Sequence, residues 1–590
     1  MSKMLLTNNK MWSSSLRNSW RELGFTENAH RDCGDAHFTV YKKLNVDNVN
    51  YYEANGDFAS SVGCLFYDDC FGEDALKRLL EDAKKDDIRS LRAKTIGSFA
   101  VAVKTANRMI VFVDETHTYD LYYCVCDNGD FIVTNTFYHI EKCVGRPVNA
   151  NAVVERGVRG GVSSLETPFD GVVALGARQY LEVDLSHSTM ALRSCELNDY
   201  RCSFEKREDA VLEIWRRAQH IAELRSKYLN KSLYFVTGGV DSRLELSASV
   251  HNGEQVTLGY WMGSDSISNG TVRDKEVQES IASLLSCECV CYDVSVPFES
   301  VLQCITSSTC DKYGELASIY CGNAKWYSIF ETIDDKDYIG FGFFGETLRN
   351  IDSLDVSYKE PFTLRDYVEK VYCRTHIEEI VKTDGFYDYL ADKAACLVGC
   401  KEGGESVVDI DTCGRLFGYS RFSADCALSN FANLFTYSFP LFGMKQVADA
   451  VFAMPYEWRS GDYIAIAMTK LWSSELLSIP YHSHHHDYVC NQETLCLERV
   501  GSDKSIVGAL KRIKPLRSFY RKHLRSHMKN GRSEWDALYA YCHGRLLESP
   551  FLRQENGFDI SADEPDEIEI ATLATFIGQT RVLEHALGIR

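Results

Sequence analysis

The pattern of hydrophobic residues changes character near residue 200. From Ala36 to about Leu192, short apolar runs with strand character follow one another closely: HFTVYKKL, DFASSVGCLFYD, GSFAVAVKT, RMIVFVDE and DFIVTN. The cluster Asp127–Asp130 lies between two such runs and predicts a hairpin turn. One segment, EDALKRLLEDAKK, has helical spacing, with acids early and lysines late as the helix dipole favours. We predict an antiparallel sheet domain here and interpret the polar residues 1–30 as a helical or irregular extension.

Beyond about Asp199, strand-like and helix-like segments alternate. The long helical pattern EDAVLEIWRRAQHIAELRSKYL leads into the apolar run SLYFV, and three further strand-like runs follow: VTLGYWM, CECVCYDVSV and YIGFGFFG. The segment EVQESIASLLS has helical spacing and lies between the first two of these runs. Strands separated by helices predict a parallel, doubly wound sheet, so the fold class is α/β. After about residue 360 the pattern is mostly helical.

Composition narrows the class of protein. A chain of 590 residues with 45% hydrophobic and 25% charged residues suits two or three folded domains. The net charge of −20 excludes a global basic footprint for nucleic acid. The first residues have no apolar signal region, and no stretch approaches the ~18 apolar residues of a membrane span. We expect a soluble, cytoplasmic protein without a membrane partner.

The 22 cysteines are scattered, and no paired CxxC motifs have zinc spacing. In a reducing compartment such residues are free thiols, which we favour over a metal site. Cys287, Cys289 and Cys291 alternate as one face of a strand would.

The segment SLYFVTGGVDSRLEL, residues 232 to 246, carries the chemistry. A buried strand ends in Thr237-Gly238-Gly239-Val240-Asp241-Ser242, and a helix begins at once. Two glycines allow a tight turn that points bare amides into a concavity at a helix N-terminus, where anions are favoured. Asp241 offers oxygen for Mg²⁺, and Arg243 could add charge to a leaving pyrophosphate. A plain Gly-Gly turn with an aspartate cap is the alternative, but the strand–loop–helix context favours phosphate binding.

This hexapeptide resembles the pyrophosphate loop, usually SGGxDS, of the ATP pyrophosphatase superfamily. The surroundings resemble the asparagine synthetase family, which includes β-lactam synthetases and lasso-peptide cyclases, over about residues 36–490. The matching segments are Asp274–Val277 at a helix start, GFGFFGETL at Gly340–Leu348 in place of GxGxDE, and YSFPLFG at Tyr437–Gly443, whose following helix ends at Met454-Pro455. In the N-terminal half GSFAVAV, Asp114 and Leu121-Tyr122-Tyr123 are similar to the family's amidotransferase domain.

The resemblance implies the architecture. Residues 1–197 would form an Ntn-amidotransferase-like α+β sandwich, and residues 198–590 an ATP pyrophosphatase-type synthetase domain with a largely helical C-terminal part. ATP and Mg²⁺ would be the cofactors, with Asp241 and Glu346 sharing the metal. A solvated loop carboxylate is the alternative role for Glu346. Nucleotide contacts would come from Thr237, Gly238, Gly239, Val240, Asp241, Ser242 and Gly342.

The N-terminus departs from the family pattern. Glutamine-dependent members begin with a catalytic cysteine, whereas this chain begins Met1-Ser2-Lys3, so glutamine hydrolysis has no attacking group. Cys33-Gly34 is similar to the family's opening dipeptide, but only cleavage after Asp32 would expose it. A serine amidohydrolase using Ser2 is a further alternative.

The synthetase half departs at two positions. Phe343 stands where the family has a catalytic Glu or Tyr, and a phenyl ring takes no proton. Asp462 stands where many members have a lysine. Transition-state charge would then fall to Arg243, Lys470 or an unrecognised cation, although a helix-surface position is the commoner situation of a lysine such as Lys470.

Two polar segments have open roles. YHSHHHDY contains His482, His484, His485 and His486, which we interpret as an exposed loop more readily than as a metal site. The stretch 510–532 has nine Lys or Arg and no acid, which suits an acidic or peptide partner or a solvated helix face.

The function that we expect is an AMP-forming amide-bond ligase acting on a small-molecule or peptide carboxylate and an amine. A catalytically impaired nucleotide-binding or scaffold protein is the alternative, and the substrates and a homo-oligomeric state stay open.

Overall fold

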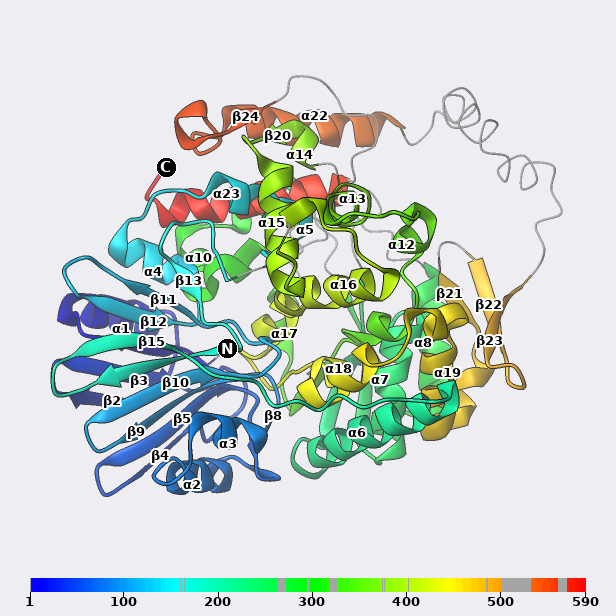
Figure 1. Cartoon of the computed structure of the whole chain (residues 1–590), viewed down its shortest axis with the longest axis horizontal. Coiled ribbons are helices and arrows are strands. Elements are labelled where there is room, and N and C mark those ends of the chain that lie inside the picture. Colours follow the sequence, from blue (N-terminus) through cyan, green and yellow to red (C-terminus); the bar gives the residue numbers. More distant parts are fainter. Residues whose placement is uncertain are drawn as a thin grey trace.

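A computed structural model describes residues 2–159, 161–163, 165–262, 272–293, 298–318, 327–373, 375, 377–401, 403–483, 486–500, 532–560 and 570–589. Antiparallel strands occupy one side of the molecule, and helices dominate the other side and the top edge in Figure 1. The small hairpin β21 (Tyr481–Ser483), β22 (His486–Asn491) and β23 (Cys496–Arg499) lies at the opposite edge from the antiparallel strands.

Two six-stranded antiparallel sheets form the N-terminal part, in the strand orders β13-β11-β12-β1-β3-β2 and β15-β14-β10-β9-β5-β4. The first sheet contains β1 (Met4–Thr7), β2 (Glu27–Cys33), β3 (Ala36–Tyr41), β11 (Tyr122–Val125), β12 (Phe131–Thr134) and β13 (Val173–Ala174). The second contains β4 (Tyr51–Ala54), β5 (Asp57–Gly63), β9 (Phe99–Thr105), β10 (Arg108–Val113), β14 (Gln179–Asp184) and β15 (Thr189–Ser194). One hydrophobic cluster joins Leu5 and Phe38 of the first sheet to Phe58 and Val111 of the second. The sheets therefore stack face to face, and the predicted antiparallel region is confirmed.

Helices cover the outer faces of this sandwich. Leu76 and Leu79 of α2 (Glu73–Asp82) and Leu91 of α3 (Ile88–Ala93) pack with residues of the second sheet in a separate cluster. On the first sheet, α1 (Lys10–Glu22) contacts β1, and α4 (Phe137–Val144) contacts β11 and β12. The layers are thus helix, sheet, sheet, helix, and the small sheet of β6 (Phe66–Tyr67), β7 (Cys70–Phe71) and β8 (Thr95–Ile96) lies at one end.

The interpretation of residues 1–30 as an extension is wrong. They form β1, α1 and most of β2, and β1 pairs with both β12 and β3 in the interior of the first sheet. Met4, Leu5 and Leu6 are each at most 1% exposed, so both faces of β1 are buried. A four-residue strand buried on both faces has no polar–apolar alternation, which is why the pattern does not reveal it.

A four-stranded parallel sheet follows, with the order β18-β17-β16-β19. Its strands are β16 (Lys231–Phe235), β17 (Gln255–Met262), β18 (Glu288–Asp293) and β19 (Tyr338–Gly340). Leu233 and Phe235 enter one hydrophobic cluster, and Tyr234 and Val236 enter another, so both faces are covered. The helices α6 (Arg207–Tyr228), α7 (Val240–His251), α8 (Val272–Leu285) and α19 (Tyr463–Ser473) contribute to the second cluster. The predicted parallel α/β sheet is confirmed.

The rest of the described chain is mainly helical, and the helical character predicted after about residue 360 is confirmed. Its helices are α5 (Ala150–Arg159), α9 (Phe298–Cys304), α10 (Ser307–Tyr313), α11 (Tyr327–Thr332), α12 (Asp352–Ser357), α13 (Leu364–Tyr367), α14 (Ile377–Ile380), α15 (Phe386–Val398), α16 (Ile410–Asp425), α17 (Ala427–Ala432), α18 (Lys445–Phe452), α22 (Arg532–Glu548) and α23 (Ile570–Ala586). The short strands β20 (Val381–Lys382) and β24 (Asp559–Ile560) pair with each other.

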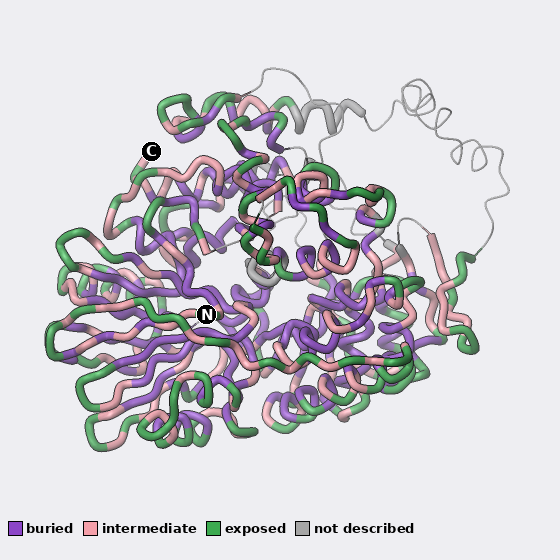
Figure 2. Tube along the Cα trace, in the orientation of Figure 1, coloured by how far each residue is buried: buried purple, intermediate pink, exposed green. Residues whose placement is uncertain are grey.

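The sandwich and the helical part share one core. The cluster that joins the two antiparallel sheets continues into α10, α15, α17 and α23, and buried segments run through the centre of the molecule in Figure 2. A boundary between residues 197 and 198 therefore stays a prediction, because no break in the hydrophobic core accompanies it.

Membrane-spanning helices and cysteines can be assessed for the described residues. Within them, no helix combines the length and the apolar character needed to cross a bilayer. The cysteines that the structure describes are free thiols. Cys289 and Cys291 of β18 are exposed.

Candidate functional site

The glycine loop lies where the parallel sheet reverses its strand order. β16 ends at Phe235, the loop Thr237–Gly239 follows, and α7 begins at Val240. β17 and β18 lie on one side of β16 and β19 lies on the other, so the carboxyl ends of β16 and β19 flank the topological switch point. Open α/β sheets bind ligands in the crevice outside that point.

The loop after β19 packs directly on the glycine loop. A Cβ added to Gly342 would lie 2.4 Å from the Cα of Ser242, and one added to Gly345 would lie 2.7 Å from the Cβ of Asp241. Gly342 also has φ +77°, a conformation that side chains rarely adopt. The two loops are therefore in backbone contact, and Gly342 has a packing role that needs no ligand.

Hydrogen bonds within the loop occupy several of its polar groups. The Thr237 amide donates to the Ser242 Oγ at 3.1 Å, and the Gly239 amide lies 3.3 Å from the Thr237 Oγ1. The Gly238 amide donates to the Asp274 Oδ1 at 2.7 Å. The expectation of bare amides is thus wrong for both glycines, because a carboxylate at the start of α8 accepts from Gly238 and the Thr237 hydroxyl accepts from Gly239. The side chain of Thr237 is exposed at the surface.

Three acidic side chains, from the two loops and from the start of α19, act on one cation. Arg349 Nη2 lies 2.7 Å from Asp241 Oδ2, in an ion pair that was not among the sequence-based predictions. Burial acts to lower the pKa of Arg349, but Asp241, Asp462 and Glu346 together raise it above its ordinary value. Three carboxylates therefore act on one guanidinium. The feature of the sequence that could have indicated this cation is an arginine three residues after Glu346.

A buried network holds the second loop in place. The Gly342 amide donates to Glu245 Oε2 at 2.7 Å, and the Tyr338 hydroxyl donates to Glu245 Oε1 at 2.8 Å. Arg225 lies 3.4 Å from Glu245 and 3.0 Å from Glu254. The side chains of all three residues are at most 1% exposed. Burial raises the pKa of Glu245. Glu245 is one turn beyond Asp241 on α7, so one helix positions both loops.

Arg243 does not face the phosphate side of the loop. Its guanidinium donates to the carbonyl oxygens of Ile479 at 2.6 Å and Pro480 at 3.0 Å, and lies 3.7 Å from the ring centroid of Tyr481. The residue is 0% exposed. The interpretation of Arg243 as a catalytic cation is therefore corrected: it anchors the chain that enters the β21–β23 hairpin.

Lys470 is also misassigned as a catalytic cation. Its side chain is exposed on α19, and Nζ lies 3.0 Å from the carbonyl oxygen of Gln492. This helix-surface position is the alternative that the sequence left open. Phe343 is half-buried and stacks on Phe341, with ring centroids 5.2 Å apart.

Of the histidine-rich segment, His482 lies at the site: it belongs to β21, and its side chain is 14% exposed, so the expected exposed loop is wrong for this residue. The His482 amide donates to the Gly238 carbonyl at 2.8 Å, and its Nδ1 lies 3.0 Å from Asp487 Oδ1. Arg273 of α8 forms a bidentate pair with Asp487 at 3.0 and 2.9 Å. The hairpin is thus fastened to both the glycine loop and α8. His484, His485 and the basic residues 510–531 lie outside the described residues.

The two alternative nucleophiles of the N-terminal part, Cys33 and Ser2, are both buried. Cys33 is buried in β2, and burial raises the pKa of its thiol, which disfavours the reactive thiolate. Ser2 is buried, and its carbonyl accepts a hydrogen bond from Asn135 at 3.2 Å.

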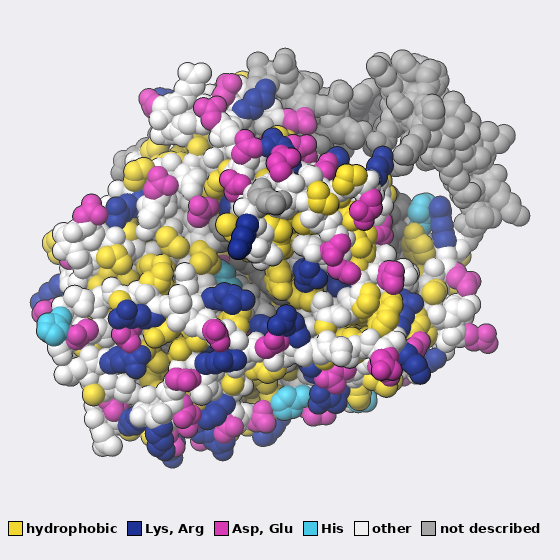
Figure 3. Space-filling model, viewed as in Figure 1, with side chains coloured by type: hydrophobic (Ala, Val, Ile, Leu, Met, Phe, Trp, Pro, Cys, Tyr) yellow, Lys and Arg dark blue, Asp and Glu magenta, His cyan; other side chains and the backbone are white. Residues whose placement is uncertain are grey.

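A cavity of about 360 Å³ lies between the sandwich and the helical part. Figure 3 shows a hollow near the centre of one face, with basic side chains around it and hydrophobic ones within. His117 lines the cavity with φ 56°, and its buried Nε2 has no hydrogen-bond partner among the described residues. Burial lowers the pKa of His117 to about 4. The other lining residues include Glu115, Arg178, Tyr419, Lys445 and Phe452.

Comparisons with known proteins leave the family open. No protein-family model matches the chain, and no curated protein matches its sequence. Among solved structures, one similar chain is a glutamine phosphoribosylpyrophosphate amidotransferase from B. subtilis complexed with ADP and GMP, at 8% identity and a TM-score of 0.21, covering 49% of this chain and 65% of that one. A second is an allosteric regulatory enzyme of purine biosynthesis, at 10% identity and a TM-score of 0.23, covering 51% and 77%.

A third is an NMN synthetase from Francisella tularensis, at 11% identity and a TM-score of 0.15, covering 46% of this chain and 94% of that one. This chain therefore spans just under two thirds of the first of these structures. Overlaps this weak carry no argument about activity, and the functional assignment depends on the site itself.

Proposed function

We propose that this protein is an ATP-dependent, AMP-forming amide-bond ligase that adenylates a carboxylate and transfers the acyl group to an amine. The observation that carries the proposal is the backbone contact between Ser242 and Gly342 at the switch point of the parallel sheet. It joins a glycine loop at a helix N-terminus to a second loop bearing an acid, in the crevice where such sheets bind nucleotides.

The nucleotide would lie with its phosphates against Thr237–Ser242 and the start of α7. The exposed Thr237 hydroxyl and the dipole of α7 favour a phosphate there. The Gly238 amide is already held by Asp274, so that peptide group is oriented before a ligand arrives. The glycines at 342 and 345 keep the second loop close enough to bear on the same ligand.

Asp241 and Glu346 are the residues that would hold Mg²⁺. Their fit is supported by the carboxylates of Asp241, Glu346 and Asp462, which all act on the same cation, Arg349. Bound there, the ion would supply charge neutralisation to the phosphates of ATP. Arg349 would have to release Asp241 first, and would then be a cation close to the phosphates.

The proposed reaction has two steps. A substrate carboxylate oxygen attacks the α-phosphorus, an acyl O–P bond forms, and the P–O bond to pyrophosphate breaks. The amine nitrogen then attacks the acyl carbon, the C–N bond forms, AMP leaves with the C–O bonding electrons, and the amine loses a proton to solvent or substrate. Phe343 offers no base for that proton. The amine would be free ammonia or part of the substrate, and peptide or natural-product tailoring is as compatible as asparagine formation.

A nucleotide-binding or scaffold protein without ligase activity is the second candidate. The Arg349–Asp241 ion pair favours it, because a cation of the chain itself already neutralises the carboxylate. Asp462 in the place of a family lysine favours it as well, since it adds a negative charge where the acyl-adenylate would need a positive one.

ATP–pyrophosphate exchange with a panel of carboxylic acids tests the ligase, and calorimetry with Mg²⁺ and ATP tests nucleotide binding separately. We expect exchange with at least one acid, and a loss of about 100-fold or more in Asp241→Asn. Asp335→Asn is the matched control, because Asp335 is exposed and pairs at 2.6 Å with Lys231. Lys231 lies at the amino end of β16, the strand that leads into the glycine loop. Binding without exchange for any acid would favour the scaffold. Absence of ATP binding, with no effect of Asp241→Asn, would exclude both.

A further inference from the structure

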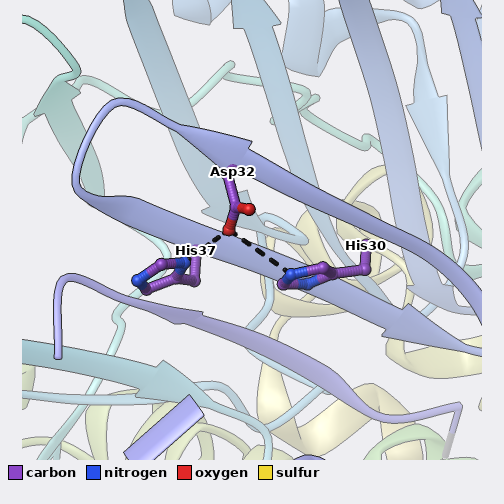
Figure 4. Close-up of side chains that lie close together, drawn as sticks. All are labelled: His30, Asp32 and His37. Carbon is purple, nitrogen blue, oxygen red and sulfur yellow. Dashed lines mark hydrogen bonds and ion pairs between the residues drawn. The ribbon is translucent and has the colours of Figure 1, made fainter. Parts of the chain in front are cut away.

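Three potential metal ligands lie together on the β2–β3 hairpin, far along the chain from the glycine loop. His30 and Asp32 are two residues apart on β2, and His37 of β3 is paired with Asp32. Side chains two residues apart on a strand share a face, and a cross-strand partner lies on that same face. Figure 4 shows the Asp32 carboxylate between the two imidazoles. One ligand atom from each residue lies within 4.8 Å of the others.

The longer of the two ligand separations suits a small transition-metal ion, and the shorter is a hydrogen bond that a bound ion would replace. Asp32 Oδ1 lies 2.6 Å from His37 Nδ1 and 3.4 Å from His30 Nε2. The imidazole rings are nearly parallel, with an interplanar angle of 13°. Zinc–nitrogen bonds of about 2.0–2.1 Å place tetrahedral ligand atoms roughly 3.3 Å apart. We propose that His30, Asp32 and His37 bind a divalent transition-metal ion of the zinc class.

A buried hydroxyl orients one of the ligands. His30 Nδ1 lies 2.9 Å from the Oγ1 of Thr39, which is 0% exposed. That contact leaves Nε2 directed towards Asp32. Metal-binding histidines characteristically use their second ring nitrogen in this way, which fixes the tautomer and the ring orientation.

The surrounding charges are compatible with an ion. Arg17 opposes a cation, but Glu27 holds its guanidinium in two contacts of 3.0 and 3.1 Å.

The location leaves an open coordination position. β2 is the last strand of its sheet, and the side chain of Asp32 is 66% exposed. Three protein ligands and access for water or another small ligand are typical of open zinc sites rather than of closed structural ones. The site is independent of the proposed ligase activity, because none of its residues contacts the glycine loop or its partners.

Titration of the full chain with Co²⁺ provides the test. Cobalt bound by nitrogen and oxygen ligands gives visible d–d bands, whereas binding to any of the 22 cysteines adds a sulfur-to-metal charge-transfer band. We expect one site with the first signature and without the second. Asp32→Asn, at an exposed side chain, and the double variant His30→Gln/His37→Gln should each weaken that site by at least about tenfold, as loss of a ligand does.

Two further variants separate a built site from adventitious binding. Thr39→Val should lower the affinity by about 10–100-fold through the lost orientation of His30. Asp184→Asn/His187→Gln removes an exposed Asp–His pair of 2.8 Å in the same part of the molecule and should change nothing. Equal Co²⁺ uptake by the wild type and by Asp32→Asn and the double variant would overturn the proposal, as would an equal loss in the control.

Discussion

Asp241 and Arg349 form an ion pair of 2.7 Å between the two loops of the switch-point crevice. Asp241, the residue proposed as a magnesium ligand, therefore has the guanidinium of Arg349 beside it. The pair is between residues 108 positions apart, so it depends on the fold and not on local sequence.

Replacing this guanidinium tests whether it competes with a metal ion. Arg349→Gln should tighten Mg²⁺ binding to the nucleotide-free protein by at least about tenfold, because a unit charge ~5 Å away opposes a divalent ion even at an effective dielectric of ~20. Calorimetric titration with Mg²⁺ measures the change. The exposed pair Arg78–Asp68 provides the control variant Arg78→Gln. Unchanged affinity in Arg349→Gln would mean that Asp241 is not a metal ligand.

The contact between Gly342 and Ser242 makes a prediction about stability. Gly342→Ala should destabilise the fold by about 3 kcal/mol or more, because the new Cβ meets backbone in addition to a left-handed φ that costs about 1–2 kcal/mol. Gly385→Ala shares the positive φ, at +67°, but has nothing within 4 Å, so it should lose only the smaller amount. Urea denaturation compares the two. Equal losses would show that the two loops separate without cost.

Much of the site could be predicted from the sequence, but only its locally encoded part. TGGVDS after an apolar strand located the loop at the end of β16, and Asp274 at a helix start proved to contact Gly238. These features depend on a strand, a turn and a helix end, whose signals lie within a few residues of one another. The parallel sheet itself followed from the alternation of strands and helices.

The partners of the loop could not be predicted in this way. Arg243 and Lys470 were chosen by their positive charge, yet the first is buried against the carbonyls of Ile479 and Pro480 and the second is exposed. Arg349 was missed, although its charge is equally visible in the sequence. Which cation faces the crevice depends on the packing of segments more than 100 residues apart.

The half-buried histidine that lines the central cavity makes a prediction about pH. Burial lowers the pKa of His117 to about 4, whereas an unfolded histidine titrates near 6.5. The unfolded chain therefore binds more protons between these values, and the stability contributed above the unfolded pKa is lost as the pH falls towards the folded one. His117→Asn suits the φ of 56°, because asparagine tolerates left-handed backbone.

The expected difference is measurable. Between about pH 7.5 and about pH 5, the free energy of unfolding of the variant should fall by about 2 kcal/mol less than that of the wild type. Urea titrations at both pH values give this difference directly. Parallel pH dependence in the two proteins would mean that His117 is protonated as readily in the folded chain as in the unfolded one.

The attachment of the hairpin to the loop makes the last prediction. Asp487 accepts from both Arg273 and His482, and the His482 amide bonds the Gly238 carbonyl, so Asp487 links α8 and the hairpin to the glycine loop. Asp487→Asn should raise the KM for ATP about three- to tenfold with little change in kcat, because a loosened loop must be ordered when the nucleotide binds.

Glu276→Gln removes the other carboxylate partner of Arg273, which lies on α8 itself, and should leave KM unchanged. Because the ion pairs that the two substitutions remove are partly exposed, each substitution should lower the free energy of unfolding by about 1 kcal/mol or less. A KM effect confined to Asp487→Asn would assign that effect to the hairpin rather than to the charge of Arg273. If both variants raise KM equally, the hairpin does not position the loop.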